Sequence, residues 1–169
     1  MRRVMLGAAA LCGVVSCVFA QETADKPAIV RGNNAKFSVA PGLPDCVTIA
    51  PAHGDPFKGA SAIILKVDSG CVVPWHWHTA NESLVPLSGL MQLTAKGEKP
   101  QVVAIGDFAY MPTQHVHMTK CASTKPCTSI LQVDAALDIH YVDKAGNEIT
   151  PEAALADVNK PPTKPATKP

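Results

Sequence analysis

The sequence of 169 residues has little net charge and few aromatic side chains. Its 15 lysine and arginine residues nearly balance 14 aspartate and glutamate residues, and aromatic residues make up 5% of the chain. A formal charge of +1 excludes the strong basic field that binding to nucleic acid or to an anionic membrane surface requires. Since 47% of the residues are hydrophobic, a chain of this length has enough apolar material for the core of one domain.

Long apolar runs are also missing beyond the N-terminus. No later run reaches the roughly 18–20 residues of a membrane-spanning helix, so no transmembrane span is expected after signal removal. Arg2 and Arg3 precede an apolar stretch over residues 6–19, and residues 18–20 form an acceptable cleavage site. This arrangement predicts a secretory signal peptide over residues 1–20 and a periplasmic or secreted protein. An alternative stays open, because residues 14–17 resemble a bacterial lipobox in which Cys17 would carry a lipid anchor.

Cysteine use fits an exported chain. Removal of residues 1–20 leaves Cys46, Cys71, Cys121 and Cys127, and an even number of cysteines in an exported protein favours disulfides. Cys121 and Cys127 enclose a turn with Lys-Pro, which favours their pairing and leaves Cys46 for Cys71. Three connectivities remain open from sequence alone. A cysteine metal site is disfavoured, because no C-x-x-C spacing occurs.

The pattern of the remaining chain predicts many short strands. Apolar or alternating runs recur from Cys46 onward, with turn residues such as Asp-Ser-Gly and Lys-Gly between them. Such spacing is typical of an all-β sandwich or barrel, and 15 prolines argue against a helical bundle. Strands are expected at residues 61–67, 72–78, 82–87, 90–95, 101–105, 108–111, 127–133 and 137–142.

A short helix follows the strands. Thr150 is a good N-cap, Pro151 suits the first helical position and Glu152 places an acid in the first turn, so a helix is expected to run to about Val158. The predicted organisation is a signal peptide at 1–20, a polar arm at 21–44, a β-rich body at 45–143, a turn and short helix at 144–159, and a disordered Pro/Lys-rich tail at 160–169.

Four of the six histidines form two close pairs, His76 with His78 and His115 with His117. Two residues that are two apart on a strand point to the same face, which for His76 and His78 should be the barrel interior. Trp75 and Trp77 then point the other way. Imidazoles that converge with a carboxylate suit Mn, Fe, Co, Ni, Cu or Zn and leave positions open for water or substrate.

The spacing around these histidines resembles the cupin superfamily. The first cupin motif is matched at each defined position, and the second is matched at its glycine, proline and histidine after a short intermotif loop of sixteen residues. The second motif departs at Gln114, where the pattern prefers glycine, and at Cys121, where it prefers asparagine. The first motif is Gly70-x5-His76-x-His78-x3-Glu82-x6-Gly89, and the second is Gly106-x5-Pro112-x-Gln114-x2-His117.

The resemblance implies a double-stranded β-helix, that is, a cupin jelly-roll barrel, over residues 45–143. It also implies that His76, His78, Glu82 and His117 ligate one divalent transition metal ion per chain. Some cupins have lost their metal, but here no ligand is deleted. His115 is expected to be either a donor or substrate contact beside the centre or a histidine at the barrel rim. His140, in the last strand, is the next candidate for the cavity, although a structural role is favoured.

Two functions from different classes follow. The first is a mononuclear metal-dependent oxidoreductase, similar to cupin dioxygenases, that acts on a small organic molecule. In this function Glu82 would be a ligand or a base, and His115 would assist proton transfer. The apolar walls of the cavity would come from Phe108, Tyr110 and Met111. The second is a non-catalytic envelope protein that binds or senses a metal or small ligand. A sugar or keto-acid isomerase ranks third, because Arg31 is the only arginine left after signal removal. A homodimer is expected by analogy only.

Overall fold

The computed structural model describes residues 27–156 and residue 158. The predicted signal peptide, Cys17 and the predicted tail lie outside these residues. The described part contains η1 (Gly32–Asn34), β1 (Val47–His53), β2 (Ser61–Val67), β3 (Val72–Trp77), β4 (Glu82–Ser88), β5 (Met91–Ala95), β6 (Gln101–Val103), β7 (Ala109–Met111), β8 (His117–Cys121), β9 (Cys127–Val133), β10 (His140–Val142), β11 (Glu148–Ile149) and α1 (Pro151–Leu155).

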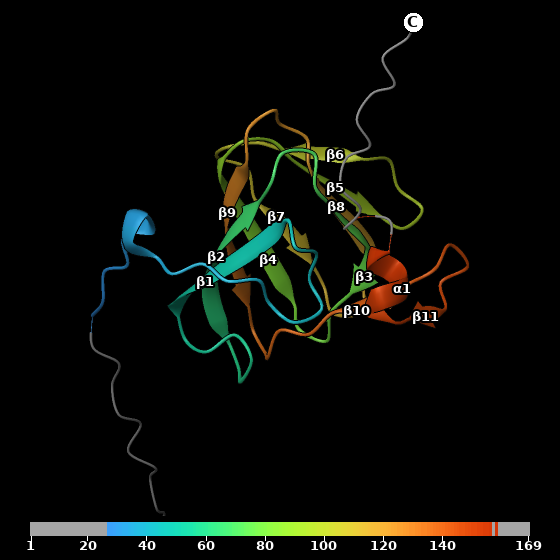
Figure 1. Cartoon of the computed structure of the whole chain (residues 1–169), viewed down its shortest axis with the longest axis horizontal. Helices are drawn as coiled ribbons and strands as arrows, with labels where there is room; N and C mark the ends of the chain where they lie inside the picture. The colour runs from blue at the N-terminus through green and yellow to red at the C-terminus, as the bar shows by residue number, and fades with distance from the viewer. Residues whose placement is uncertain (1–26, 157, 159–169) are drawn as a thin grey trace, which may run out of the picture.

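These strands form two antiparallel sheets that face each other (Figure 1). A five-stranded sheet has the order β1-β2-β9-β4-β7, and a six-stranded sheet has the order β11-β10-β3-β8-β5-β6. Strands distant in the chain are neighbours in both sheets, as β2 and β9 are in one and β3 and β8 are in the other. The predicted all-β jelly-roll class with one short C-terminal helix is therefore confirmed.

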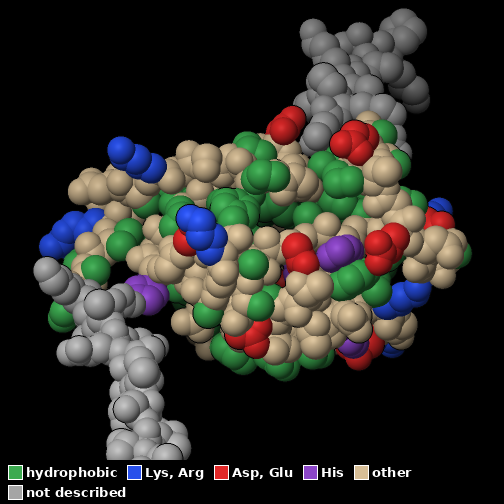
Figure 2. Space-filling model, turned by 90° about the horizontal axis from the view of Figure 1, so that it is seen from below, with side chains coloured by type: hydrophobic (Ala, Val, Ile, Leu, Met, Phe, Trp, Pro, Cys, Tyr) green, Lys and Arg blue, Asp and Glu red, His purple; other side chains and the backbone are tan. Residues whose placement is uncertain are grey.

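The core lies between the two sheets. In β2, Ile63 and Val67 are almost fully buried, and they belong to one apolar cluster with Ile49 of β1 in the same sheet and Met91 of β5 in the other. Full burial of one such side chain is worth roughly 1.5–3 kcal/mol, so this layer is the main source of stability. Most charged side chains lie on the surface, and Figure 2 shows both acidic and basic side chains on one face of the molecule.

Both favoured disulfides are present. Cys46 pairs with Cys71, and Cys121 pairs with Cys127, with Cα–Cα distances of 6.0 and 5.7 Å. The second bridge joins the end of β8 to the start of β9. Gly89 lies against it in a left-handed conformation with φ of 77°, and a Cβ there would lie 2.8 Å from the Cys127 Sγ. Only glycine fits this position without displacing the bridge.

The structure differs from the expected strand limits in several places. The strand β8 was not predicted, because its residues follow a Pro-Thr-Gln turn and two of its five members are histidine and lysine. The strand expected at 137–142 begins only at His140, and the helix ends at Leu155 rather than near Val158. Its predicted N-cap is confirmed, since the Thr150 side chain accepts a hydrogen bond from the Ala153 amide. Within the described residues, no helix is long and apolar enough to cross a membrane.

Candidate metal centre

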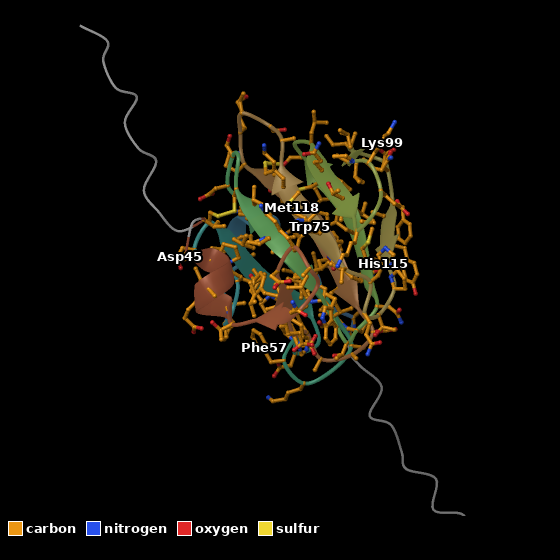
Figure 3. The ribbon with its side chains drawn as sticks, turned by 90° about the vertical axis from the view of Figure 1, so that its right-hand side faces the viewer. Asp45, Phe57, Trp75, Lys99, His115 and Met118 are labelled. Atoms are coloured by element: carbon orange, nitrogen blue, oxygen red, sulfur yellow. A yellow bond between two sulfur atoms is a disulfide. The ribbon has the colours of Figure 1, made fainter. Side chains whose placement is uncertain are left out.

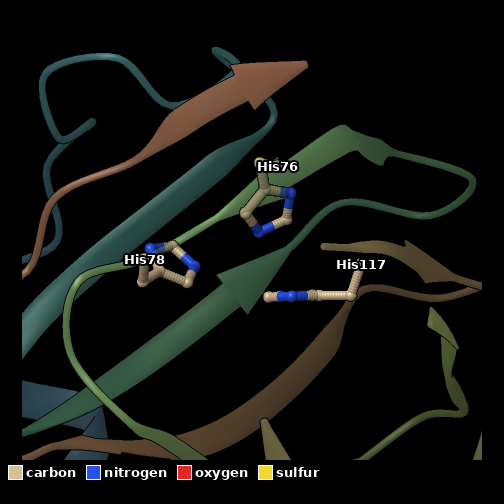
Figure 4. Close-up of side chains that lie close together, drawn as sticks. All are labelled: His76, His78 and His117. Atoms are coloured by element: carbon tan, nitrogen blue, oxygen red, sulfur yellow. The ribbon is translucent and has the colours of Figure 1, made fainter. Parts of the chain in front are cut away.

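Two neighbouring strands bring three histidines together. His76 lies in β3, His78 directly follows it, and His117 opens β8, where it pairs with His76 across the ladder. The nitrogen atoms that the three imidazoles offer lie within 4.8 Å of one another, and all three residues are buried. Figure 4 shows the rings turned toward a common space. This group can hold a metal ion.

A carboxylate enters from the opposite sheet. Glu82 is the first residue of β4, and its Oε2 lies 3.3 Å from Nε2 of His78 and 3.5 Å from Nε2 of His117. Its side chain is buried like those of the histidines. The predicted set of three histidines and one glutamate is thus assembled in one place, although its role as a ligand set stays a prediction.

Each imidazole is held through the nitrogen that faces away from this space. Nδ1 of His76 lies 2.6 Å from the Pro74 carbonyl, and Nδ1 of His117 lies 2.9 Å from the His115 carbonyl. Nδ1 of His78 contacts the Asp138 carbonyl. Because a carbonyl only accepts, each Nδ1 carries the proton, and the lone pair of Nε2 is left free. This is the tautomer that a metal bound through Nε2 requires.

Two buried atoms of the centre lack a hydrogen-bond partner. They are Oε2 of Glu82 and Nε2 of His117. Burying such groups unsatisfied costs about 1–3 kcal/mol each, so an ion or water that accepts their lone pairs is the expected explanation. Three imidazoles and a carboxylate are donors that suit a divalent transition metal. The residues present therefore fit the group that the sequence implies.

The electrostatics of the centre depend on burial and on the charges of its members. Burial, followed by the electrostatic interactions with His117 and His78, holds the pKa of His76 well below its usual range. Burial raises the pKa of Glu82, but the neighbouring imidazoles of His117 and His78 outweigh it and leave this pKa well below its usual range. Burial lowers the pKa of His78, yet Glu82 and the Asp138 contacts raise it overall. At neutral pH, Glu82 is a carboxylate and His76 is neutral.

The loop between His78 and Glu82 is anchored by polar groups from two other segments. The Asp138 carboxylate accepts hydrogen bonds from the Thr79 amide at 2.9 Å and the Thr79 hydroxyl at 2.5 Å. The Asp134 carboxylate binds the Asn81 amide at 2.8 Å and its side-chain nitrogen at 2.5 Å. These carboxylates come from the segment between β9 and β10, and sequence reasoning missed both.

The turn before β8 anchors the same loop from another side. The Gln114 amide donates to the His78 carbonyl at 2.8 Å, and the Thr113 hydroxyl donates to the Thr79 carbonyl at 2.8 Å. Gln114 has a φ of 58°, a left-handed conformation that favours glycine. The residue that departs from the second cupin motif therefore keeps the backbone conformation that a glycine would supply.

The remaining predicted residues lie outside the cluster. His115 precedes β8 rather than lying in it, so strand alternation does not direct its side chain inward, and its assigned role stays a prediction. His140 stacks on Trp77 with ring centroids 3.9 Å apart and is one-third exposed, so it does not enter the cavity. Figure 3 shows Trp75 and Met118 close together on the outer side of β3 and β8, as predicted for Trp75.

The space beside the centre is small and apolar. A cavity of about 40 Å³ touches His76, His78 and Glu82, and Thr119 is the one other polar residue among those of the described chain that line it. Aliphatic side chains from both sheets make up the rest of its lining. This volume accommodates an ion with a few water molecules.

Comparison with known proteins gives the family. The model of the cupin domain matches residues 63–133, a range that contains all four residues of the centre. No curated protein matches the sequence.

Solved structures support the same conclusion at low identity. The polyketide cyclase RemF from Streptomyces resistomycificus aligns with a TM-score of 0.61 at 15% identity over 70% of this chain and 87% of its own. An RmlC-like cupin from Ralstonia eutropha JMP134 aligns with a TM-score of 0.58 at 18% identity over 79% of this chain and 85% of its own. The DMSP lyase DddQ from Ruegeria pomeroyi DSS-3 aligns with a TM-score of 0.53 at 18% identity over 72% of this chain. The alignment spans only 63% of the length of the lyase. At these identities the likeness shows the fold alone, and the domain match shows that residues 63–133 of this chain are a cupin domain.

Proposed function

We propose that this cupin is an exported oxidoreductase of the dioxygenase type that holds one divalent transition metal on His76, His78, Glu82 and His117 and acts on a small organic molecule. The observation that carries the proposal is the convergence of three buried imidazoles whose Nδ1 atoms are already hydrogen-bonded, so that Nε2 remains for an ion. When bound, the metal would supply Lewis acidity and, if it is redox-active, electron transfer.

The chain itself would supply orientation and a base. Glu82 is buried and ionised, and it lies within 3.5 Å of two of the imidazoles. A carboxylate in this position can ligate or can accept a proton from a substrate hydroxyl. His115 follows the turn that anchors the loop next to His78, and there it would relay that proton to solvent. The apolar surroundings exclude bulk water from the centre.

A non-catalytic binding or sensing function is the second candidate, and the small central cavity favours it. A space of about 40 Å³ suits a metal ion with a few water molecules. Apart from His76, His78 and Glu82, none of the described residues that line this cavity has a titratable side chain. Tight metal binding without turnover is the expectation of this alternative.

Export is supported by the two disulfides, because such bonds persist in oxidising compartments. The first 20 residues would then be removed, or Cys17 would carry a lipid. Mass spectrometry of the N-terminus of the protein from its own cell envelope distinguishes a start at Gln21 from a lipidated Cys17. An unprocessed start at Met1 would contradict export.

Oxygen uptake tests the enzymatic part of the proposal. The protein is loaded separately with Fe, Mn, Cu, Ni, Co and Zn and offered a panel of phenols and small carbonyl compounds. Steady uptake with a redox-active metal, lost in Glu82→Gln at equal metal content, is the expected result. Stoichiometric metal binding without oxygen uptake for any combination of metal and test compound would contradict the oxidoreductase function and favour the binding function.

A further inference from the structure

A second and larger hollow opens between the free edges of the two sheets. It has a volume of about 390 Å³ and lies between the β5–β6 hairpin of one sheet and β7 of the other, and we call it the side pocket. Its volume falls in the range of pockets for small organic ligands, unlike that of the central cavity. It is lined by Glu98, Asp107, Phe108, Tyr110 and Met111 together with Gln101 and aliphatic residues of β5, β6 and β7.

Two strands that line the side pocket, β7 and β5, are direct neighbours of strands that carry residues of the metal centre, β4 and β8. Met111, which lines it, pairs with Glu82 across β7 and β4. Ala95, which also lines it, pairs with His117 across β5 and β8. A molecule in this pocket would therefore lie next to the strands that carry Glu82 and His117.

The pocket offers apolar and aromatic surface to solvent. Phe108 is 65% exposed, Tyr110 52% and Val102 55%, in a chain with few aromatic residues. Exposed apolar side chains that gather at a hollow mark a binding surface. The Tyr110 hydroxyl donates to Asn81 at 2.9 Å, which fixes the ring and ties it to the loop between His78 and Glu82.

The charge of the pocket has one sign. Glu98 and Asp107 are its charged lining residues, and among the described residues no lysine, arginine or histidine lines it. Lys96, in the same turn as Glu98, lines a different hollow beside Asp143, and its ammonium lies next to Gly146. Lys99 lies at the outer tip of the hairpin (Figure 3). Carboxylates beside aromatic faces attract cations and repel anions.

We propose that the side pocket binds a small organic cation with an aromatic body, such as an arylalkylamine, and selects it over the corresponding carboxylate. Its role in presenting this molecule to the metal rests on the proposed function, but binding itself does not. The ammonium group would lie near Glu98 and Asp107, and the ring would pack on Phe108 and Tyr110.

Three matched probes test this selectivity: tryptamine, tryptophol and indole-3-acetate, which carry a positive, a neutral and a negative side chain on one ring system. Calorimetric titration of the metal-free full chain should give a Kd for tryptamine about tenfold below that for indole-3-acetate, with tryptophol between them. In the double variant Glu98→Gln/Asp107→Asn, the difference should shrink to about twofold. Phe108→Ala should weaken all three, and Asp143→Asn, outside the pocket, should change none.

Equal or tighter binding of indole-3-acetate, absence of binding by all three probes, or an unchanged preference in the double variant would overturn the proposal. Presentation to the centre is tested separately by NMR of tryptamine with protein loaded with paramagnetic Mn²⁺. The expected result is strong broadening of the probe signals that His76→Ala abolishes. Failure of Mn²⁺ and of the other divalent transition metals to bind would contradict the metal centre, whereas Mn²⁺ binding without broadening of bound probe would contradict only presentation.

Discussion

At the scale of single residues, the histidines of the centre differ from the others in how their rings are held. His76, His78 and His117 each use Nδ1 on a backbone carbonyl and direct Nε2 inward. His140 instead stacks on Trp77 and contacts the Asp138 carboxylate at 3.2 Å, so it belongs to the outer surface. Burial and backbone hydrogen bonding, rather than residue type alone, separate candidate ligands from structural histidines.

Glu82 carries both a binding and a chemical prediction. The substitution Glu82→Gln keeps the shape of the side chain but removes the charge near His78 and His117. Metal affinity should fall by about tenfold, since three imidazoles remain, whereas turnover should fall by about 10²-fold or more because the base is lost. Competition titration with a chelator and oxygen uptake at saturating metal measure the two effects. A loss of equal size in both would show that Glu82 is only a ligand.

His115 has a backbone role through its carbonyl and a proposed catalytic role through its imidazole, and a substitution can distinguish the two. His117 is held by the His115 carbonyl, which any residue at position 115 supplies. The substitution His115→Ala should therefore leave the metal content unchanged and reduce turnover by about 10²-fold if the imidazole relays a proton. Metal analysis and uptake rates on one preparation decide this. Full activity in His115→Ala would contradict a catalytic role for the His115 side chain.

At the scale of elements, the loop from His78 to Glu82 is the part of the barrel that most depends on distant groups. Asp138 and Asp134 hold Thr79 and Asn81, and the Gln114 turn holds the His78 carbonyl. The strands alone would bring His76 and His117 together, because these two residues are direct ladder partners. The loop anchors instead determine where His78 lies relative to that pair, whereas Glu82 is placed by its ladder partners Met111 and Val133.

Loss of the Asp138 carboxylate should loosen this loop. Asp138→Ala keeps the carbonyl that holds His78 but removes both hydrogen bonds to Thr79, so metal affinity should fall by about tenfold or more. Asp138→Asn retains an acceptor for the Thr79 amide and should lose less. Asp143→Ala, which removes a similar turn carboxylate near Asn147, is the matched control and should bind metal normally. Equal affinities for Asp138→Ala and the control would contradict the anchoring role.

Sequence patterns could predict the strands and the histidine cluster but not the anchors. Alternation in β2 to β4 and the fixed spacing of His76, His78 and Glu82 are local signals, and they agree with the observed strands. The contact between Thr79 and Asp138 joins residues 59 apart, and no local pattern encodes it. A second long-range contact explains why the strand expected at 137–142 starts late, since the Asp138 carbonyl contacts Nδ1 of His78 instead of a ladder partner.

At the scale of the whole molecule, two sheets and two disulfides fix the barrel around the centre. Cys46–Cys71 closes a segment of 25 residues that includes β1 and β2, whereas Cys121–Cys127 closes one of only 6. A crosslink stabilises chiefly by restricting the unfolded chain, and a longer loop gives the larger effect. The first bridge is therefore expected to contribute more to global stability.

Removal of each bridge tests this ranking. The chain-entropy relation gives about 3.5 kcal/mol for the Cys46–Cys71 loop and about 2 kcal/mol for the Cys121–Cys127 loop. The double variant Cys46→Ala/Cys71→Ala should accordingly unfold at lower urea concentration than Cys121→Ala/Cys127→Ala, and both below wild type. The reverse order would show that packing around the buried Cys121 and Cys127 outweighs loop length.

The most direct test of the account is the metal content of the protein purified from its own cell envelope. Elemental analysis should find about one transition metal ion per chain, since His76, His78, Glu82 and His117 form one centre. His76→Ala should lose the ion, and His115→Ala should keep it. Absence of metal from the wild-type protein, or full metal content in a folded His76→Ala variant, would contradict the central claim that these residues hold a metal.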